Sequence, residues 1–173
     1  FMPYLQNVAG LTGVNYRLEP WSYREDEGCE MGNIFTPCVA AAGDPATPTL
    51  KAHAGDRVMI NVFGAHNEQN QMFLVDGHQW RRHLNQVGSD MIDVEEFGGG
   101  EWIQAEMSAG GTYSNPGTYL WMNGRTPYRQ AGQWGYFKVL PAGDRSILPL
   151  GGASAKGVKS ASKVGDDVLS MND

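Results

Sequence analysis

Cysteine is scarce in this sequence, which has 2 cysteines in 173 residues, Cys29 and Cys38. The two lie close together in a segment rich in glycine, proline and asparagine. Zinc thiolates are the alternative to a disulfide, but the spacing is not Cys-x-x-Cys and no histidine lies nearby. The pattern therefore favours a local disulfide, which indicates a periplasmic or extracellular setting.

Long apolar runs and basic stretches are missing as well. The apolar runs are only a few residues long, far short of the roughly 20 that span a bilayer, so we expect no transmembrane segment. A net charge of -6 and a pI of about 5.1 leave no basic stripe to neutralise phosphates. Nucleic acid is therefore not expected as a partner.

What the sequence does have is a pattern of short strands. Apolar and polar residues alternate over 50–54 and 58–62 around a turn at Gly55-Asp56, which predicts a strand pair with one buried face. Further strands are predicted at 71–75, 79–82, 102–107, 119–122 and 134–140. The acidic, glycine-rich stretch 87–101 is predicted to be a loop. Seven or more short strands without a long helical period are typical of an antiparallel β-sandwich.

Composition divides the chain into three parts. Residues 1–44 mix aromatic, acidic and turn residues, and we predict an arm that wraps the sandwich, with one short strand at 14–18. Residues 45–141 form the sandwich domain. Residues 142–173 turn to glycine, alanine, serine and lysine, which cannot bury enough surface to offset their ordering entropy, and they are predicted to be a flexible tail or linker.

A series of short motifs covers more than two-thirds of the chain. In order they are Asn15-Tyr16-Arg17-Leu18-Glu19-Pro20, Gly43-Asp44-Pro45-Ala46-Thr47-Pro48, Gly55-Asp56-Arg57-Val58, Gly64-Ala65-His66-Asn67, Gly77-His78-Gln79-Trp80 and the closing segment 117–140. In this order they resemble one cupredoxin domain of the large bacterial multicopper oxidases, the group that includes manganese-oxidase-like proteins. The resemblance implies an all-β, cupredoxin-like Greek-key β-sandwich.

The departures from that family pattern fall on its copper ligands. Met122, Asn123 and Gly124 stand where the family has His-Cys-His, and Gln133 stands where it has the axial methionine. A His-x-His pair is replaced by Gln71 and Phe73. A blue-copper centre needs a thiolate and two imidazoles, and no cysteine follows Cys38. We therefore expect no catalytic residue and no metal ligand in this chain.

The resemblance implies a non-copper structural domain or subunit of a secreted multicopper oxidase. Copper would then lie in partner cupredoxin domains or chains, which oxidise metal ions such as manganese, or organic reductants, and reduce oxygen. The alternative is a free-standing binding or assembly module without redox activity. Fold alone does not choose between the two.

Histidine gives the strongest remaining candidate for a site. His78 could reach a metal at a domain boundary, particularly if His66 and His83 converge with it. The other interpretation is a histidine packed by Trp80 and hydrogen-bonded to the backbone. We favour the second, because no partner lies at His-x-His spacing on the same strand.

Three other groups of residues have a functional and a structural interpretation. The carboxylates of the predicted 87–101 loop could bind calcium or manganese, or could simply be solvated; they are Asp90, Asp93, Glu95 and Glu96. Scattered methionines could relay copper(I) but are expected to pack in the core; they are Met59, Met72, Met91, Met107 and Met122. Four arginines could pair with acids of a neighbouring domain or could be solvated edge charges; they are Arg81, Arg82, Arg125 and Arg129.

Overall fold

The computed structural model describes residues 34–35, 46–65 and 69–147. Strands dominate this part of the chain, together with one helix, α3 (Thr126–Gln130), and one 3-10 turn, η3 (Gly111–Tyr113). The strands are β1 (Thr49–His53), β2 (Arg57–Phe63), β3 (Gln71–Val75), β4 (Trp80–Arg81), β5 (Met91–Ile92), β6 (Val94–Phe97), β7 (Trp102–Ser108), β8 (Gly117–Asn123) and β9 (Trp134–Leu140). The predicted strands at 71–75, 102–107, 119–122 and 134–140 are confirmed.

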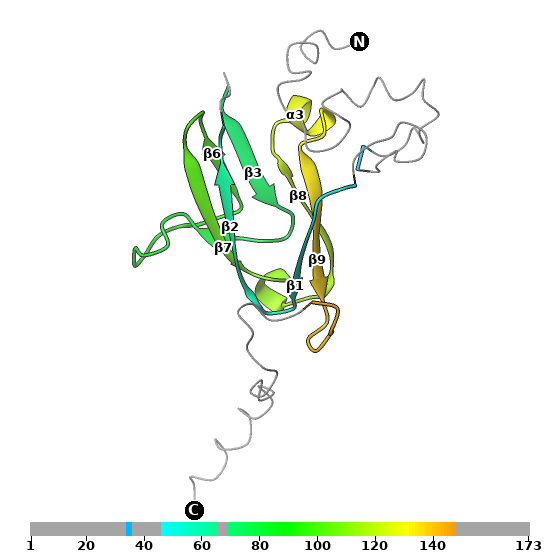
Figure 1. The fold of residues 1–173 in the computed structure, drawn as a ribbon. Helices are drawn as coiled ribbons and strands as arrows, with labels where there is room; N and C mark the ends of the chain where they lie inside the picture. Colours follow the sequence, from blue (N-terminus) through cyan, green and yellow to red (C-terminus); the bar gives the residue numbers. More distant parts are fainter. Residues whose placement is uncertain (1–33, 36–45, 66–68, 148–173) are drawn as a thin grey trace, which may run out of the picture.

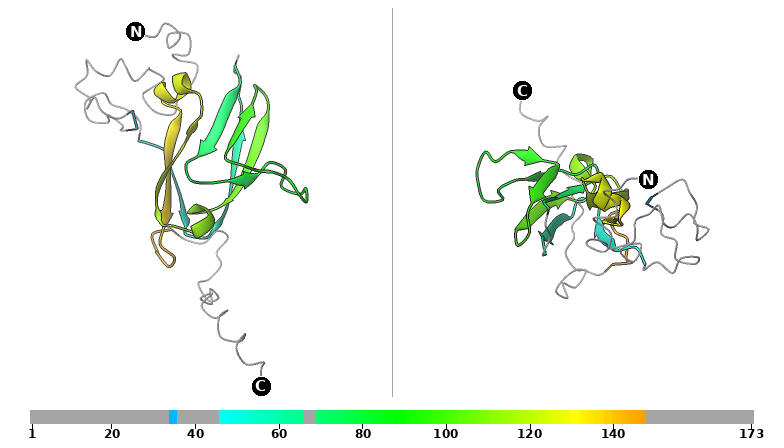
Figure 2. Two further views of the ribbon diagram at one scale, coloured as in Figure 1. Left: turned by 180° about the vertical axis from the view of Figure 1, so that it is seen from behind. Right: turned by 90° about the horizontal axis from the view of Figure 1, so that it is seen from above.

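The strands form two layers around one core (Figures 1 and 2). One layer is a five-stranded sheet in the order β1-β9-β8-β3-β6, in which β1 runs parallel to β9 and the other pairs are antiparallel. The other layer is the antiparallel pair β2-β7, and β4-β5 forms a short ribbon. Among neighbours in the large sheet, only β8 and β9 follow each other directly in sequence. The predicted all-β sandwich is confirmed for these residues.

The core lies between the two layers. Alternate residues of β3, β7 and β9 point into it, because successive side chains on a strand point to opposite faces. Its buried members are Ala52, Phe73, Val75, Trp80, Phe97, Ile103, Ala105, Met107, Ala109, Phe137 and Val139. The tilted contact of the Phe73 and Trp80 rings, with centroids 6.1 Å apart and 50° between the ring planes, joins β3 to the β4-β5 ribbon.

The prediction that the two strands on either side of Gly55-Asp56 pair with each other is wrong. β1 pairs with β9 in the large sheet, whereas β2 pairs with β7 in the other layer. The reason is visible in the turn: Gly55 N–H donates to the Ala109 carbonyl at 2.9 Å, and Ala109 N–H donates to the Asp56 carbonyl at 2.8 Å. These bonds fix the corner against the end of β7, so the chain crosses from one sheet to the other.

The loop predicted at 87–101 is also wrong, because it contains β5 and β6. β6 is an edge strand that pairs with β3 over Val94 to Phe97. In its sequence, Val-Glu-Glu-Phe, two adjacent acidic residues interrupt the alternation of apolar and polar residues that indicates a strand. Charged residues are common on edge strands, where they discourage pairing with another chain.

No prediction included α3, a single turn of helix between β8 and β9. Pro127 stands in its first turn, where a missing N–H costs nothing. Its residue Tyr128 and the following Ala131 are buried as a small second cluster. The signal was therefore present in the Thr126-Pro127 pair, but the segment is too short to show a helical period.

Several predictions concern residues outside the described part of the chain. They are the Cys29–Cys38 disulfide, the strand at 14–18 and the tail over 148–173. Two residues of the predicted arm, Ile34 and Phe35, are described, and Phe35 contacts the sandwich. The Phe35 ring meets the Trp134 ring edge-on at 5.5 Å, and the Tyr136 hydroxyl donates to the Phe35 carbonyl at 2.7 Å.

Candidate functional site: an amide cluster and a buried histidine

Three side-chain amides meet at the end of β8, at positions that the resemblance compares with copper ligands. Asn123 is the centre: its Nδ2 donates to Gln71 Oε1 and to Gln133 Oε1, both at 2.6 Å. Gln71 and Asn123 are 5% and 6% exposed, so this amide cluster is shielded from water. The residues come from β3, from β8 and from the residue before β9.

The amide orientations of Asn123 and Gln71 are each fixed by a second bond. Asn123 Oδ1 accepts the Arg125 N–H at 2.9 Å, so the Asn123 NH₂ group must face the two glutamines. Gln71 Nε2 donates to the Gln69 carbonyl at 2.8 Å, so its Oε1 must face Asn123. The Asn123 backbone N–H also donates to the Gln133 carbonyl at 3.0 Å. The buried hydrogen-bonding groups of Asn123 are therefore satisfied within the protein.

A second set of bonds ties the cluster to α3 and to the start of β3. Arg125 donates to the Asn70 carbonyl at 2.6 Å and to Gln69 Oε1 at 2.9 Å. The Tyr128 hydroxyl donates to the same Gln69 oxygen at 2.7 Å, and the Arg125 guanidinium lies 4.9 Å from the Tyr128 ring centroid. Arg125 therefore binds other residues of the same domain. Both sequence interpretations had placed the arginines elsewhere, either against a neighbouring domain or in solvent.

The donors of the amide cluster do not fit a blue-copper centre. Such a site takes a soft thiolate and imidazole nitrogens, whereas the cluster offers only neutral amides whose oxygens already accept hydrogen bonds. Gly124 stands where the family has the second histidine of His-Cys-His. A Cβ added there would lie 3.1 Å from the Met72 Cβ and 3.5 Å from Leu74 Cδ2, so a side chain would be crowded.

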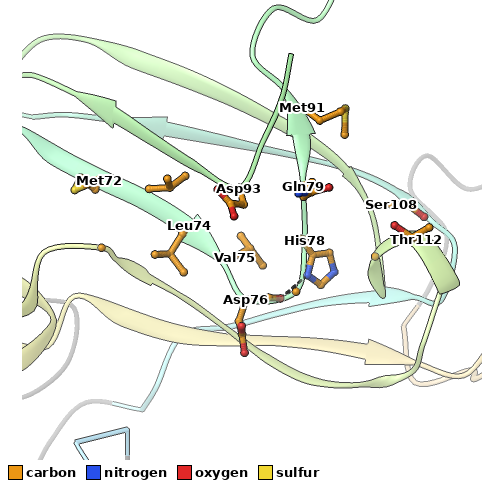
Figure 3. A pocket seen from close by; sticks show the side chains of 14 residues that line it. Met72, Leu74, Val75, Asp76, His78, Gln79, Met91, Asp93, Ser108 and Thr112 are labelled. Atoms are coloured by element: carbon orange, nitrogen blue, oxygen red, sulfur yellow. Dashed lines mark hydrogen bonds between the residues drawn. The ribbon is translucent and has the colours of Figure 1, made fainter. Parts of the chain in front are cut away.

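His78 is buried at the opposite end of β8, and both of its ring nitrogens are occupied. Its Nε2 accepts the Gly110 backbone N–H at 3.0 Å, so Nε2 carries no proton. Its Nδ1 must then be protonated, and it donates to the Asp76 carbonyl at 2.7 Å, drawn dashed in Figure 3. Neither nitrogen has a lone pair left for a metal.

The rings around His78 differ from the prediction in one respect. Its imidazole contacts Tyr119 edge-on at 4.7 Å and Phe137 at 5.2 Å, whereas the Trp80 ring pairs with Phe73. The backbone-bonded histidine is therefore confirmed, but its packing partners are on β8 and β9. His83 lies exposed between β4 and β5, and His66 lies outside the described residues.

The four carboxylates of the predicted acidic loop do not gather. Glu95 accepts a bond from Trp80 Nε1 at 3.3 Å, and Glu96 accepts one from Asn70 Nδ2 at 2.9 Å. Asp90 and Asp93 lie exposed beside β5. Among residues 34–35, 46–65 and 69–147, no group of three or more metal-ligating side chains is assembled.

Only part of the prediction for the methionines is confirmed. Met107 is a core residue at 3% exposed, as expected. Met59 and Met91 are 46% and 51% exposed, so for these two core packing is wrong. The Met122 sulfur is 3.7 Å from an Arg129 guanidinium nitrogen, and Met72 lies on the outer side of β3. The methionines are spread over separate strands.

A hollow of about 790 Å³ opens beside β3 (Figure 3). Met72, Leu74 and Met91 give it apolar walls, and the exposed carboxylates Asp76 and Asp93 lie at its sides. His78 also lines it, but both nitrogens of that ring are engaged by the backbone. His78 therefore presents no free ring nitrogen to the hollow.

Two carboxyl groups have perturbed pKa values, and both lie at the surface. Hydrogen bonds from the Arg57 guanidinium, which clasps both oxygens, hold the pKa of Glu106 below its ordinary value. Hydrogen bonding from Ser146, with the nearby His53 and Lys51, lowers the pKa of Asp144. Both groups are ionised at neutral pH, and neither is poised for proton transfer.

The comparisons with solved structures find copper proteins at low identity. A multicopper oxidase is 18% identical, with a TM-score of 0.44, over 52% of this chain and 32% of that one. A copper nitrite reductase from Nitrosomonas europaea is 19% identical, with a TM-score of 0.42, over 59% and 33%. The McoA multicopper oxidase from Aquifex aeolicus is 16% identical, with a TM-score of 0.45, over 70% and 25%.

This chain spans about a third or less of the length of those proteins. At such identities and scores the likenesses support no conclusion about activity. No protein-family model matches the chain, and no curated protein matches it. Within the described part of the chain, no helix is long and apolar enough to cross a membrane.

Replacing Asn123 should cost more than its size suggests. The change Asn123→Ala leaves the Gln71 and Gln133 oxygens and the Arg125 N–H without their partner, and a buried unsatisfied group costs about 1–3 kcal/mol. We expect a loss of that order in the free energy of unfolding, measured by urea denaturation. The control Asn61→Ala, on the exposed side of β2, should change it by less than about 0.5 kcal/mol. Equal losses in the two variants would contradict the role given to the cluster.

His78 should be the Nδ1–H tautomer in solution. The two backbone bonds require this proton position, because Gly110 N–H donates to Nε2. Long-range ¹H–¹⁵N correlation spectra of the imidazole distinguish the tautomers, with the exposed His83 as the internal reference. A dominant Nε2–H form of His78 would show that the Gly110 bond is absent.

The Arg57–Glu106 pair should contribute to stability at neutral pH and lose that contribution in acid. Because the folded-state pKa of Glu106 is lowered, its contribution is present above the unfolded pKa of about 4.3 and is lost as pH falls through the folded value. Unfolding free energies of Glu106→Gln should therefore depend less on pH between about 5 and 3 than those of the unchanged chain. Asp90→Asn, an exposed site, is the control; an unchanged slope in Glu106→Gln would refute the coupling.

Proposed function

We propose that this chain is a non-copper structural domain or subunit of a secreted multicopper oxidase. In this proposal the copper lies in partner cupredoxin domains or chains, which oxidise metal ions or organic reductants and reduce oxygen. This chain supports those partners and takes no part in electron transfer. It acts in the periplasm or outside the cell, a setting in which the predicted Cys29–Cys38 disulfide would be stable.

The observation that carries the proposal is the amide cluster around Asn123. Its three members occupy positions that the sequence resemblance assigns to copper ligands, and they bind one another instead. A domain that has exchanged metal ligands for a closed set of amide bonds keeps its rigid sandwich and gives up redox chemistry. The backbone bonds of His78 support the same conclusion at the other end of β8.

The surface of the β2-β7 pair offers a place for a copper-bearing partner. Phe63 and Trp102 face each other directly across the two strands and are 68% and 59% exposed. Aromatic side chains are enriched in protein interfaces, where they supply large apolar contact area. We assign this aromatic pair to the contact with a copper-bearing cupredoxin domain or chain.

The test is the copper content of natively purified protein, with the intact mass and the partners identified in the same sample. We expect copper only where other copper-binding domains or chains accompany this one. Copper retained by this chain alone would overturn the proposal. The absence of copper and of any copper-binding partner would favour the second candidate, a free-standing binding or assembly module with the same sandwich.

A further inference from the structure

The hollow beside β3 has the size of a small-molecule site. Its volume of about 790 Å³ falls in the range of roughly 300–1,000 Å³ that is typical of ligand pockets. Its 14 lining residues come from β3 and the turn after it, from the β5-β6 segment, from the end of β7, from η3 and from the residue after β8 (Figure 3). The walls therefore depend on the packing of the sandwich and not on one loop alone.

One part of the hollow is apolar. Met72 and Leu74 of β3 and Val94 of β6 form this part, and all three side chains are half-buried. Strand register places Leu74 directly opposite Val94, so these two side chains stand on the same side of the sheet. Methionine is flexible and adapts to apolar groups of irregular shape. This part of the hollow can therefore hold a small apolar body.

The hollow also carries negative charge that the described residues leave unpaired. In the view of Figure 3, the Asp93 side chain lies between those of Leu74 and Gln79, and Asp76 lies on the turn after β3. Within residues 34–35, 46–65 and 69–147, neither carboxylate takes part in an ion pair or a hydrogen bond. No lysine or arginine is among the lining residues of this described part. Charge complementarity therefore favours a cation as the occupant.

The arrangement fits an organic cation better than a metal ion. A hard ion such as calcium takes roughly six to eight oxygen ligands, and the described residues assemble no group of that kind. Copper(I) would need thioethers that converge, whereas Met72 and Met91 lie far apart in Figure 3. A neutral apolar molecule would cover Asp93 without giving its carboxylate a partner, which costs free energy.

The lining also indicates which kind of organic cation fits. Quaternary ammonium groups are recognised by the faces of aromatic rings, and no Phe, Tyr or Trp lines the hollow in the described part of the chain. A primary ammonium group instead donates hydrogen bonds, and an ionised carboxylate accepts them. The lining therefore favours a primary ammonium group.

We propose that this hollow binds a small primary ammonium compound. Its charged group lies at Asp93, and its apolar body lies against Met72, Leu74 and Val94. Asp76 adds to the negative potential that attracts the cation. This inference does not depend on the proposed function, because it concerns this chain alone and needs neither copper nor a partner.

Three probes of nearly equal size test the preference for a cation. They are 2-phenylethylammonium, 2-phenylethanol and phenylacetate, which are positive, neutral and negative, and each is titrated while NMR follows the ¹³C-methyl resonances of the methionines. We expect the ammonium probe to shift the Met72 and Met91 resonances to saturation. It should bind at least about fivefold more tightly than the other two probes, because one charge pair near the surface contributes that much.

Met59 is the internal control for this titration. It is 46% exposed, close to the 51% of Met91, but it lies on the outer side of β2 and does not line the hollow. Its resonance should stay in place. Shifts at Met59 as large as those at Met72, or shifts that do not saturate, would show that the probe has no defined site and would overturn the proposal.

Two variants that remove one negative charge complete the test. Asp93→Asn should weaken binding of the ammonium probe about fivefold. Asp90→Asn removes an exposed carboxylate that does not line the hollow, and it should leave the affinity unchanged. Equal affinities for the three probes, or equal losses in the two variants, would overturn the proposal. The probe comparison uses the unchanged chain, so a misfolded variant does not decide the result.

Discussion

The end of the sandwich that carries α3 depends on one buried side chain, Asn123. Its NH₂ group joins the two glutamines, and its oxygen holds the backbone of Arg125 where β8 turns into α3. In a low-dielectric interior such a network is strong when complete and costly when one member is lost. The connection from β8 through α3 to β9, and the start of β3, are therefore positioned by hydrogen bonds of one buried amide.

The opposite end of β8 has a similar construction, with a histidine at its centre. His78 links the turn after β3 to the Gly110 backbone beside η3, and Tyr119 and Phe137 enclose the ring. The backbones at Gly77 and Gly111 approach each other closely here, because a Cβ on Gly111 would lie 2.7 Å from the Gly77 carbonyl oxygen. The two polar groups therefore secure both ends of the large sheet, and both leave their donors and acceptors satisfied within the protein.

Much of the fold could be predicted from the sequence, because most strands show a clear alternation. β9, for example, places Gly135, Phe137 and Val139 on the core side and Lys138 in solvent. Two predictions about the fold were wrong, each for a physical reason. Gly55-Asp56 has the composition of a hairpin turn, but bonds to Ala109, distant in sequence, send β1 and β2 into different sheets. β6 carries adjacent acids on an edge, which no periodicity reveals.

The site was predictable only in part. The resemblance pointed to Gln71, Asn123 and Gln133 as replacements, yet their mutual bonding follows from the register of β8 with β3, which is distant in sequence, and with β9. For His78, the absence of a second histidine favoured backbone bonding, but Tyr119 and Phe137 could not be foreseen as its neighbours. The role of Arg125 was missed, since a charged residue between two strands gives no sign of which carbonyl it will meet.

The most direct test of this account is the side-chain amide of Asn123, followed by ¹⁵N NMR while copper is added to the isolated chain. We predict two separate Nδ2–H resonances that exchange slowly with water, because Asn123 is buried and both hydrogens are bonded to glutamine oxygens, and that stay in place with one equivalent of copper. Averaged, rapidly exchanging resonances, or resonances that shift or broaden at one equivalent of copper with those of Gln71 and Gln133, would contradict it.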